Sequence, residues 1–151
     1  MVLMAYGTPT YQSPPPAVAY GSWLQRVAAY LLDGVITGVP LLIGVALASA
    51  VGGGTGMALY LLLALVSLVI HIYNRWIMAG RTGQSWGKKV VGLRLIAEQT
   101  GQPIGAGMAF VRDLAHIVDG VICYVGYLFP LWDVKRQTIA DKMLSTVVVT
   151  V

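Results

Sequence analysis

Six ionisable side chains stand inside or beside long apolar stretches of this chain, where ionised groups are rare. An ionised side chain at the centre of a membrane helix costs at least ~2.5 to 3.5 kcal/mol, so each one needs a partner or a functional reason. The six are Arg26, Asp33, His71, Arg112, His116 and Asp119. They are our candidates for intramembrane groups that bind an ion or a ligand.

Asp33 is the central candidate, because it is the one formally charged residue between Val27 and Asn74. Arg26 lies seven residues earlier on the same helix face, roughly 10 Å away along the axis, so a direct bond between the two is not expected. In apolar surroundings a carboxylate seeks a cation or a donor. The candidate partners of Asp33 are therefore Arg112, His71 and His116.

Two interpretations of this constellation stay open. Asp33 with a histidine could form an ion or proton relay, or line a polar cavity for a ligand. Alternatively, the carboxylate belongs to a buried ion pair that fixes how the helices pack. The i, i+4, i+7 spacing of Arg112, His116 and Asp119 places these three side chains on one helix face.

The sequence lacks the patterns of nucleophilic, metal-dependent and phosphate-binding catalysis. The glycine-rich stretch 80–89 does not match the G-x-x-x-x-G-K-[ST] loop, because its Gly-Lys pair is followed by a second lysine. His71 and His116 alone do not define a metal site. Cys123 is the single cysteine, which excludes an intramolecular disulfide, and we expect it to be a small buried residue. We expect no enzymatic activity, no cofactor and no metal.

Composition points to lipid as the main solvent of this chain. Hydrophobic residues make up 57% of its 151 residues and charged residues only 11%. A bilayer core of ~30 Å needs about 20 apolar residues per helix. Two segments meet this length, from about Trp23 to Val51, with a kink expected at Pro40, and from about Met57 to Met78. The glycines at 52–54 end the first segment, and so short a loop predicts an antiparallel helical hairpin.

Residues 1–22 form a Pro-rich arm that we expect to be flexible, and residues 23–151 are predicted to form one membrane domain. The arm contains no Lys or Arg and no apolar core as long as that of a signal peptide, so it is not expected to be a secretion signal.

The segment after the hairpin is polar, and we place it outside the bilayer core. Residues 90–97 within it predict a strand, and the Val- and Thr-rich residues 145–151 are its candidate partner. The third apolar region, about 106–132, carries charges in its first half, and its second half is too short to cross alone. We favour an amphipathic helix with a broken or re-entrant piece over a third span, since this returns the last strand to the side of the first.

The predicted fold class is therefore an all-α membrane protein with a small cytoplasmic β-element. Its parts are the hairpin of two transmembrane helices and the broken or re-entrant third apolar helical region.

Basic clusters beside the apolar segments account for the net charge of +4. They are typical of the cytoplasmic ends of membrane helices rather than of a nucleic-acid-binding surface. We therefore expect the loop after the second span and the N-terminus to lie in the cytoplasm. In this loop, Lys88, Lys89 and Arg94 are expected to contact anionic phospholipid headgroups, at about 1 kcal/mol each, or to act only as topology anchors.

Several separated motifs occur in order along the chain. They are Arg26, Asp33, the stretch 83–94 with the sequence GQSWGKKVVGLR, the pair Arg112-Asp113, and the closing segment 133–149 with Asp141. Together they resemble the RDD family of small bacterial membrane proteins, over nearly the whole length after Gly21. The family is named for an arginine and an aspartate of the first membrane helix and for a further aspartate. In this chain these residues look like Arg26, Asp33 and Asp141.

The resemblance implies a bacterial cell-membrane protein of undefined activity. Transport of unknown ligands and cation/proton exchange have been suggested for members of the family, while others look like accessory components of larger systems. The small size of this chain, without an appended soluble domain, weighs against a self-sufficient transporter. Lys135, Arg136 and Asp141 are expected to join Arg26 in a cytoplasmic polar cluster.

We predict from these features an accessory or structural subunit that packs against a larger membrane complex or a second copy of itself. The small residues that would form the packing faces are Gly34, Gly38 and Gly44. The alternative is a small oligomeric transporter or cation/proton exchange component. In that case Asp33 titrates or coordinates the cargo, and Arg26 or Arg112 balances its charge.

Overall fold

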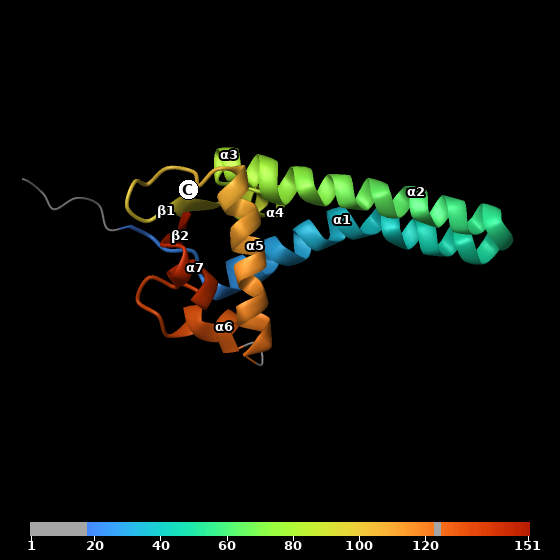
Figure 1. The fold of residues 1–151 in the computed structure, drawn as a ribbon. Helices are drawn as coiled ribbons and strands as arrows, with labels where there is room; N and C mark the ends of the chain where they lie inside the picture. Colours follow the sequence, from blue (N-terminus) through green and yellow to red (C-terminus); the bar gives the residue numbers. More distant parts are fainter. Residues whose placement is uncertain (1–17, 123–124) are drawn as a thin grey trace, which may run out of the picture.

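The computed structural model describes residues 18–122 and 125–151. Most of the Pro-rich arm and Cys123 lie outside the described residues, together with the predictions made for them. A long helical hairpin extends from a small head, in which the short helices and the sheet gather (Figure 1). The predicted fold class is confirmed: two long apolar helices, a broken third region and a two-stranded sheet.

The hairpin is built from α1 (Trp23–Val51) and α2 (Gly53–His71), which pack side by side. Ser22 caps α1 through a capping box with Gln25, so the helix begins where the sequence leaves the arm. Pro40 lies within α1 without ending it.

The turn of the hairpin is tighter than predicted, because α2 begins at Gly53 rather than near Met57. Gly52, at φ +66°, is the one residue between the helices, and this region of φ favours glycine. Close packing begins at once: a Cβ on Gly56 would lie 2.7 Å from the carbonyl oxygen of Ala48. Glycine at this position therefore lets the two backbones meet.

The helical path of α2 continues through a π-helical stretch, η1 (Ile72–Met78), and a last turn, α3 (Ala79–Thr82). Trp23–Val51 and Gly53–Thr82 are each long and apolar enough to cross a membrane. Large apolar side chains such as Leu42, Leu61 and Val69 are exposed along the hairpin, as expected of surfaces that face lipid or other helices.

The head is organised around a two-stranded antiparallel sheet. β1 (Leu93–Ala97) follows the short helix α4 (Trp86–Val90) and pairs with β2 (Thr146–Thr150). Residues 90–97 and 145–151 were the predicted partners, so the predicted sheet is confirmed. Tyr20, which the sequence places in the arm, forms a bridge to Val149.

The core of the head joins the sheet to the first helix. Leu93 and Leu95 of β1 and Val148 of β2 are buried against Ala29 of α1. Gly21 donates its N–H to the carbonyl of Val148 at 2.9 Å. The start of α1 is therefore fixed to both strands.

The third apolar region is broken into α5 (Ala106–Val121), α6 (Val125–Leu128) and the 3-10 turn η2 (Phe129–Leu131). The two parts of this region are bent by 106° with respect to each other. α5 runs across the base of the hairpin rather than along it, and α7 (Ile139–Met143) leads into β2 (Figure 1). The break predicted for this region is present.

Candidate functional site

Asp33 ties the first helix to the head through three neutral hydrogen-bond donors. Its carboxylate accepts from Asn74 Nδ2 at 2.7 Å, from Ser85 Oγ at 2.6 Å and from Gly87 N at 2.8 Å. The residue is 2% exposed. Both carboxylate oxygens are engaged, so a buried carboxylate is stabilised here without a direct ion pair among the described residues.

This arrangement, which we call the Asp33 latch, corrects the predicted partners of Asp33. The sequence offered Arg112, His71 and His116, and none of these bonds to the carboxylate. The donors are instead an amide, a hydroxyl and a backbone N–H, which cannot be recognised from charge. A weak signal was present, since Asn74 is a polar residue at the end of an apolar span.

Local structure places each donor of the latch. Asn74 lies in the π-helical stretch η1 and is fully buried, and its side-chain oxygen accepts from Trp86 N at 2.8 Å. Ser85 is the N-cap of α4, so its hydroxyl stands at the start of that helix. A Cβ on Gly87 would lie 2.1 Å from the carbonyl oxygen of Ala29, so α4 can approach α1 only with glycine there.

Asp141 is the second buried carboxylate and it binds two arginines. Arg26 Nη1 lies 2.8 Å from Asp141 Oδ2, and Arg112 donates through Nε and Nη2 to Oδ1 at 2.8 and 2.6 Å. Thr146 Oγ1 and the N–H of Thr138 add two further donors. Asp141 therefore joins α1, α5, α7 and β2.

These contacts keep Asp141 ionised although it is fully buried. Burial by itself raises the pKa of a carboxyl group, but Arg112 and Arg26 outweigh it and hold the pKa of Asp141 well below its usual range. The arginine and the two aspartates that match the family's name thus do not form one cluster: Arg26 meets Asp141, and Asp33 has its own donors.

Two further carboxylates on α5 attach it to its neighbours. The carboxylate of Asp113 accepts two hydrogen bonds from the guanidinium of Arg75, at 3.1 and 2.8 Å, and one from the indole N–H of Trp76, at 2.9 Å. His71 Nε2 is 4.0 Å from the same carboxylate. The predicted candidate His71 therefore lies beside the ion pair of Arg75 and Asp113. Neither of these two residues was among the six intramembrane candidates.

Asp119 attaches α5 to α7, whereas Asp113 attaches it to η1. His116 Nδ1 lies 2.6 Å from Asp119 Oδ2, and Asp119 Oδ1 accepts from the N–H of Ile139 at 3.1 Å and of Ala140 at 3.4 Å. The ring of His116 stacks on Tyr127 with centroids 5.4 Å apart. The shared helix face predicted for these residues thus serves to position α5 on α7.

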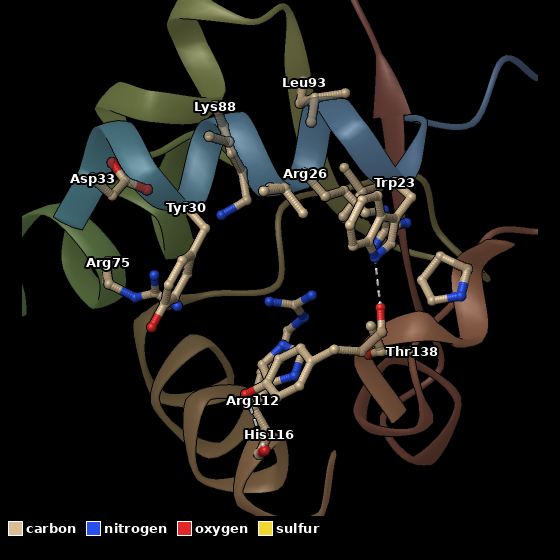
Figure 2. Close-up of a pocket in the computed structure, with 15 residues that line it drawn as sticks. Trp23, Arg26, Tyr30, Asp33, Arg75, Lys88, Leu93, Arg112, His116 and Thr138 are labelled. Atoms are coloured by element: carbon tan, nitrogen blue, oxygen red, sulfur yellow. Dashed lines mark hydrogen bonds between the residues drawn. The ribbon is translucent and has the colours of Figure 1, made fainter. Parts of the chain in front are cut away.

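Between these attachment points lies a pocket with a volume of about 350 Å³. It is lined by Trp23, Arg26, Val27, Ala29, Tyr30, Asp33, Arg75, Lys88, Leu93, Arg112, His116, Tyr127, Pro130, Thr138 and Val148. Lys88 from α4 and Arg112 from α5 extend toward the same space from opposite sides, with Tyr30 and Arg75 on one flank and Trp23 on the other (Figure 2). We call this space the basal pocket.

Lys88 differs from the arginines of the basal pocket because its side chain takes no part in the ion pairs that hold the head together. It is partly buried, and no hydrogen bond or ion pair reaches its ammonium from residues 18–122 or 125–151. Burial, and then the charges of Arg112 and Arg75, lower the pKa of Lys88 to about 7. This lysine was predicted at the membrane surface with Lys89 and Arg94, but only those two are exposed.

The predicted cytoplasmic cluster is only partly assembled. Arg26 and Asp141 meet, whereas Lys135 pairs with Glu98, and Arg136 is exposed in a turn with φ +52°. No group of three or more His, Cys, Asp or Glu side chains within the described ranges is arranged to hold a metal ion.

Comparison with known proteins gives matches at both family and protein level. The model of the RDD family matches residues 20–145. The "Proline-rich antigen" of Mycobacterium leprae is 40% identical over 87% of this chain and 61% of its own length. The "Proline-rich antigen homolog" of Mycobacterium tuberculosis (strain CDC 1551 / Oshkosh) is 48% identical over 64% of this chain and 40% of its own length.

A relative from another genus matches over most of both chains. The "Uncharacterized protein YxaI" of Bacillus subtilis is 31% identical over 77% of this chain and 87% of its own length. By contrast, the chain covers about three fifths and two fifths of the lengths of the two mycobacterial relatives. No solved structure matches the chain.

Proposed function

This chain belongs to the RDD family of membrane proteins, and from that premise and the open face of α1 we propose that it is an accessory or structural subunit of a larger membrane assembly. The observation that carries the proposal is a pair of glycines one helical turn apart. A Cβ added to Gly34 or to Gly38 would meet nothing within 4 Å. Small residues with this spacing let two membrane helices approach closely.

The third small residue of α1 supports this interpretation by contrast. Gly44 is buried against α2, where its added Cβ would lie 3.1 Å from Leu63 Cβ. One small position of α1 is thus occupied by the chain's own hairpin, while the pair at 34 and 38 is left open. The open pair is the place where a helix of a partner, or of a second copy, would pack.

The head supports a positioning role better than a chemical one. Its buried carboxylates each fasten two or more elements: Asp33 holds η1 and α4 on α1, and Asp141 holds α1 and α5 on α7. A rigid base of this kind would fix the direction of the hairpin. We propose that the head lies on the cytoplasmic side of the bacterial cell membrane, in accordance with its basic residues.

The test is purification at native expression level in a mild detergent, followed by identification of stoichiometric partners. The double variant Gly34→Leu with Gly38→Leu should lose the partner, because two bulky side chains hold the helices apart. Val39→Leu is the matched control, since Val39 is exposed on the same helix and already carries a side chain. A wild-type chain that elutes alone as a monomer would contradict the proposal.

A small transporter or cation/proton exchange component is the second candidate, because the basal pocket reaches Asp33. In this case Asp33→Asn should abolish a cation- or proton-dependent flux in proteoliposomes while the protein still assembles. The geometry favours this candidate less, since both oxygens of Asp33 already accept hydrogen bonds. The absence of flux with the wild-type chain would remove it.

A further inference from the structure

The basal pocket combines an apolar wall with a few cationic groups. Its volume of about 350 Å³ is within the ~300 to 1,000 Å³ that is usual for small-molecule sites. Apolar side chains of α1, β1, η2 and β2 make up much of the lining, namely Val27, Ala29, Leu93, Pro130 and Val148. A site of this composition suits a ligand that has both an apolar part and a charged part.

Three cations on three different elements have hydrogen-bonding capacity left. Lys88 on α4 has no partner for its ammonium within the described parts of the chain. Arg26 Nη2 on α1 is buried and bonds to none of these residues. Arg112 on α5 gives Nε and Nη2 to Asp141, so its Nη1 remains. Of these donors, Arg26 Nη2 is buried without an acceptor among the described residues, which is costly, and an anion in the pocket could accept from it while pairing with the charges of Lys88 and Arg112.

Cationic side chains outnumber carboxylates in the lining of the basal pocket. The cations that line it are Arg26, Arg75, Lys88 and Arg112, and the carboxylates that line it or pair with these cations are Asp33, Asp113 and Asp141. Asp119 does not line the pocket and faces His116 and the first amides of α7. An anionic ligand in the pocket would therefore face four cationic side chains and the single lining carboxylate Asp33.

The position of the pocket along the hairpin indicates where such a ligand comes from. Residues 34–51 of α1 and 53–70 of α2 carry no formally charged side chain, and each stretch is roughly 27 Å long at 1.5 Å per residue. This length is close to the ~30 Å of a bilayer core. The part of α1 that lines the pocket, 23–33, directly precedes the first stretch, which is the level of the lipid phosphates if the hairpin spans the membrane.

We propose that the basal pocket binds the phosphodiester group of an anionic phospholipid, with Lys88, Arg112 and Arg26 as its cationic contacts. The apolar wall receives the glycerol and the first part of an acyl chain. The phosphodiester supplies acceptor oxygens for these cations, and the apolar wall has no counterpart in a free phosphate ion. The contact differs from a surface attraction of Lys89 and Arg94 to headgroups, because it encloses the phosphate between α1, α4 and α5.

The charge state of Lys88 is consistent with such a ligand. Because its pKa is about 7, a bound anion would favour the protonated form and would be favoured by it in turn. Charge-assisted hydrogen bonds of this kind are shorter and about twice as strong as neutral ones.

The experiment measures lipid retention by the purified full chain in a mild detergent with native mass spectrometry. Equal amounts of phosphatidylglycerol and phosphatidylcholine are offered, and inorganic phosphate is the third arm. We expect phosphatidylglycerol to be retained, and Lys88→Met to reduce its retention by about tenfold, the loss of one charge-assisted contact. Lys89→Met, one residue away on the exposed side of α4, should lower the retention of phosphatidylglycerol much less than Lys88→Met, because it removes only a solvent-screened surface attraction.

Three outcomes would overturn the proposal. These are equal retention by Lys88→Met and Lys89→Met, equal retention of the two lipids, and binding of inorganic phosphate without phosphatidylglycerol. If Lys88→Met does not elute as a folded protein, Lys88→Arg decides the question. This variant keeps the charge, so retention of phosphatidylglycerol supports the proposal and its loss contradicts it.

Discussion

At the scale of single residues, the buried carboxylates Asp33 and Asp141 differ in the groups that stabilise them. Asp141 is held by two arginines, whereas Asp33 is held by an amide, a hydroxyl and a backbone N–H. The distinction matters because a carboxylate that accepts three hydrogen bonds has little capacity left for a cargo ion. Asp33 is better understood as a structural acceptor at the point where α1 enters the head.

Substitution of Asp33 tests this interpretation. In Asp33→Asn the carboxylate charge is lost and one acceptor oxygen becomes an N–H₂ group. This group fits only opposite Ser85, whose hydroxyl must then accept instead of donate, and the bonds from Asn74 and Gly87 are no longer charge-assisted. We expect the variant to lose about 1 to 3 kcal/mol of stability, seen as a lower midpoint of thermal unfolding in detergent. Glu98→Gln, which removes a solvent-screened pair with Lys135, should leave this midpoint nearly unchanged. Equal midpoints for wild type and Asp33→Asn would show that the latch does not stabilise the fold.

Lys88 gives the molecule a pH dependence with a defined sign. Its pKa is about 7 in the folded chain and 10.5 ordinarily, so between these values the unfolded chain binds more protons than the folded one. The contribution of Lys88 to stability therefore increases as the pH rises from about 7 toward 10.5, while the affinity for an anion decreases. The charged groups around it are Asp33 of α1, Arg75 of η1, and Arg112 and Asp113 of α5.

Midpoints of thermal unfolding at neutral and alkaline pH, compared between wild type and Lys88→Met, measure this effect. The unfolding midpoint of the wild type should approach that of Lys88→Met as the pH rises, because the deprotonated lysine no longer places a charge in the pocket. A difference that is constant across this range would mean that Lys88 is not titrating there.

At the scale of elements, glycines determine how closely the head packs on the hairpin. Gly87 is the clearest case, since a Cβ there would lie 2.1 Å from the carbonyl oxygen of Ala29 and 3.0 Å from the carboxyl carbon of Asp33. Gly87→Ala should therefore push α4 away from α1 and break the Asp33 latch. We expect the free energy of unfolding to fall by about 1 to 3 kcal/mol, as is typical of overpacking in a core, together with a lower yield of folded protein.

Gly107→Ala is the matched control for this variant. Gly107 is in the first turn of α5, and a Cβ there would meet nothing within 4 Å. Alanine stabilises helices relative to glycine by roughly 0.5 to 1 kcal/mol, so Gly107→Ala should be neutral or slightly stabilising. If both variants unfold at the same temperature, close approach at Gly87 is not limiting.

The elements themselves could be predicted from the sequence, but their contacts could not. Hydrophobic length indicated the hairpin. A stretch of β-branched and aliphatic residues indicated the first strand and a Val- and Thr-rich stretch the second, because these signals are local. A break in the third apolar region was inferred from the need to return the last strand and the basic residues to the side of the first strand, and the structure ends α5 at Val121. The partners of Asp33 depend on a π-helical turn and on the approach of α4, which are tertiary features without a local signal.

The same limit applies to the candidate site. The residues that line the basal pocket include four of the six intramembrane candidates, Arg26, Asp33, Arg112 and His116. Lys88 was assigned to the membrane surface because a lysine beside a second lysine is typical of a topology anchor. Only the packing of α4 on α1 separates the two, turning Lys88 inward and leaving Lys89 exposed.

At the scale of the whole molecule, the sheet determines which parts lie on the same side of the membrane. β1 follows the hairpin and β2 closes the chain, and they are paired along their full length. A third crossing by α5 and α6 would separate the strands, whereas a broken region that stays at one interface keeps them together. The hairpin tip would then be the part of the described chain that reaches the opposite side.

Cysteine accessibility in intact cells tests this arrangement most directly. In a Cys123→Ser background, one cysteine replaces Thr55 near the hairpin tip and another, in a separate variant, replaces Val134 after the broken region; both positions are exposed. We expect an impermeant maleimide to label position 55 from outside the cells, and position 134 only after the membrane is permeabilised. Labelling of position 134 in intact cells, or protection of position 55 from the external reagent, would contradict this arrangement.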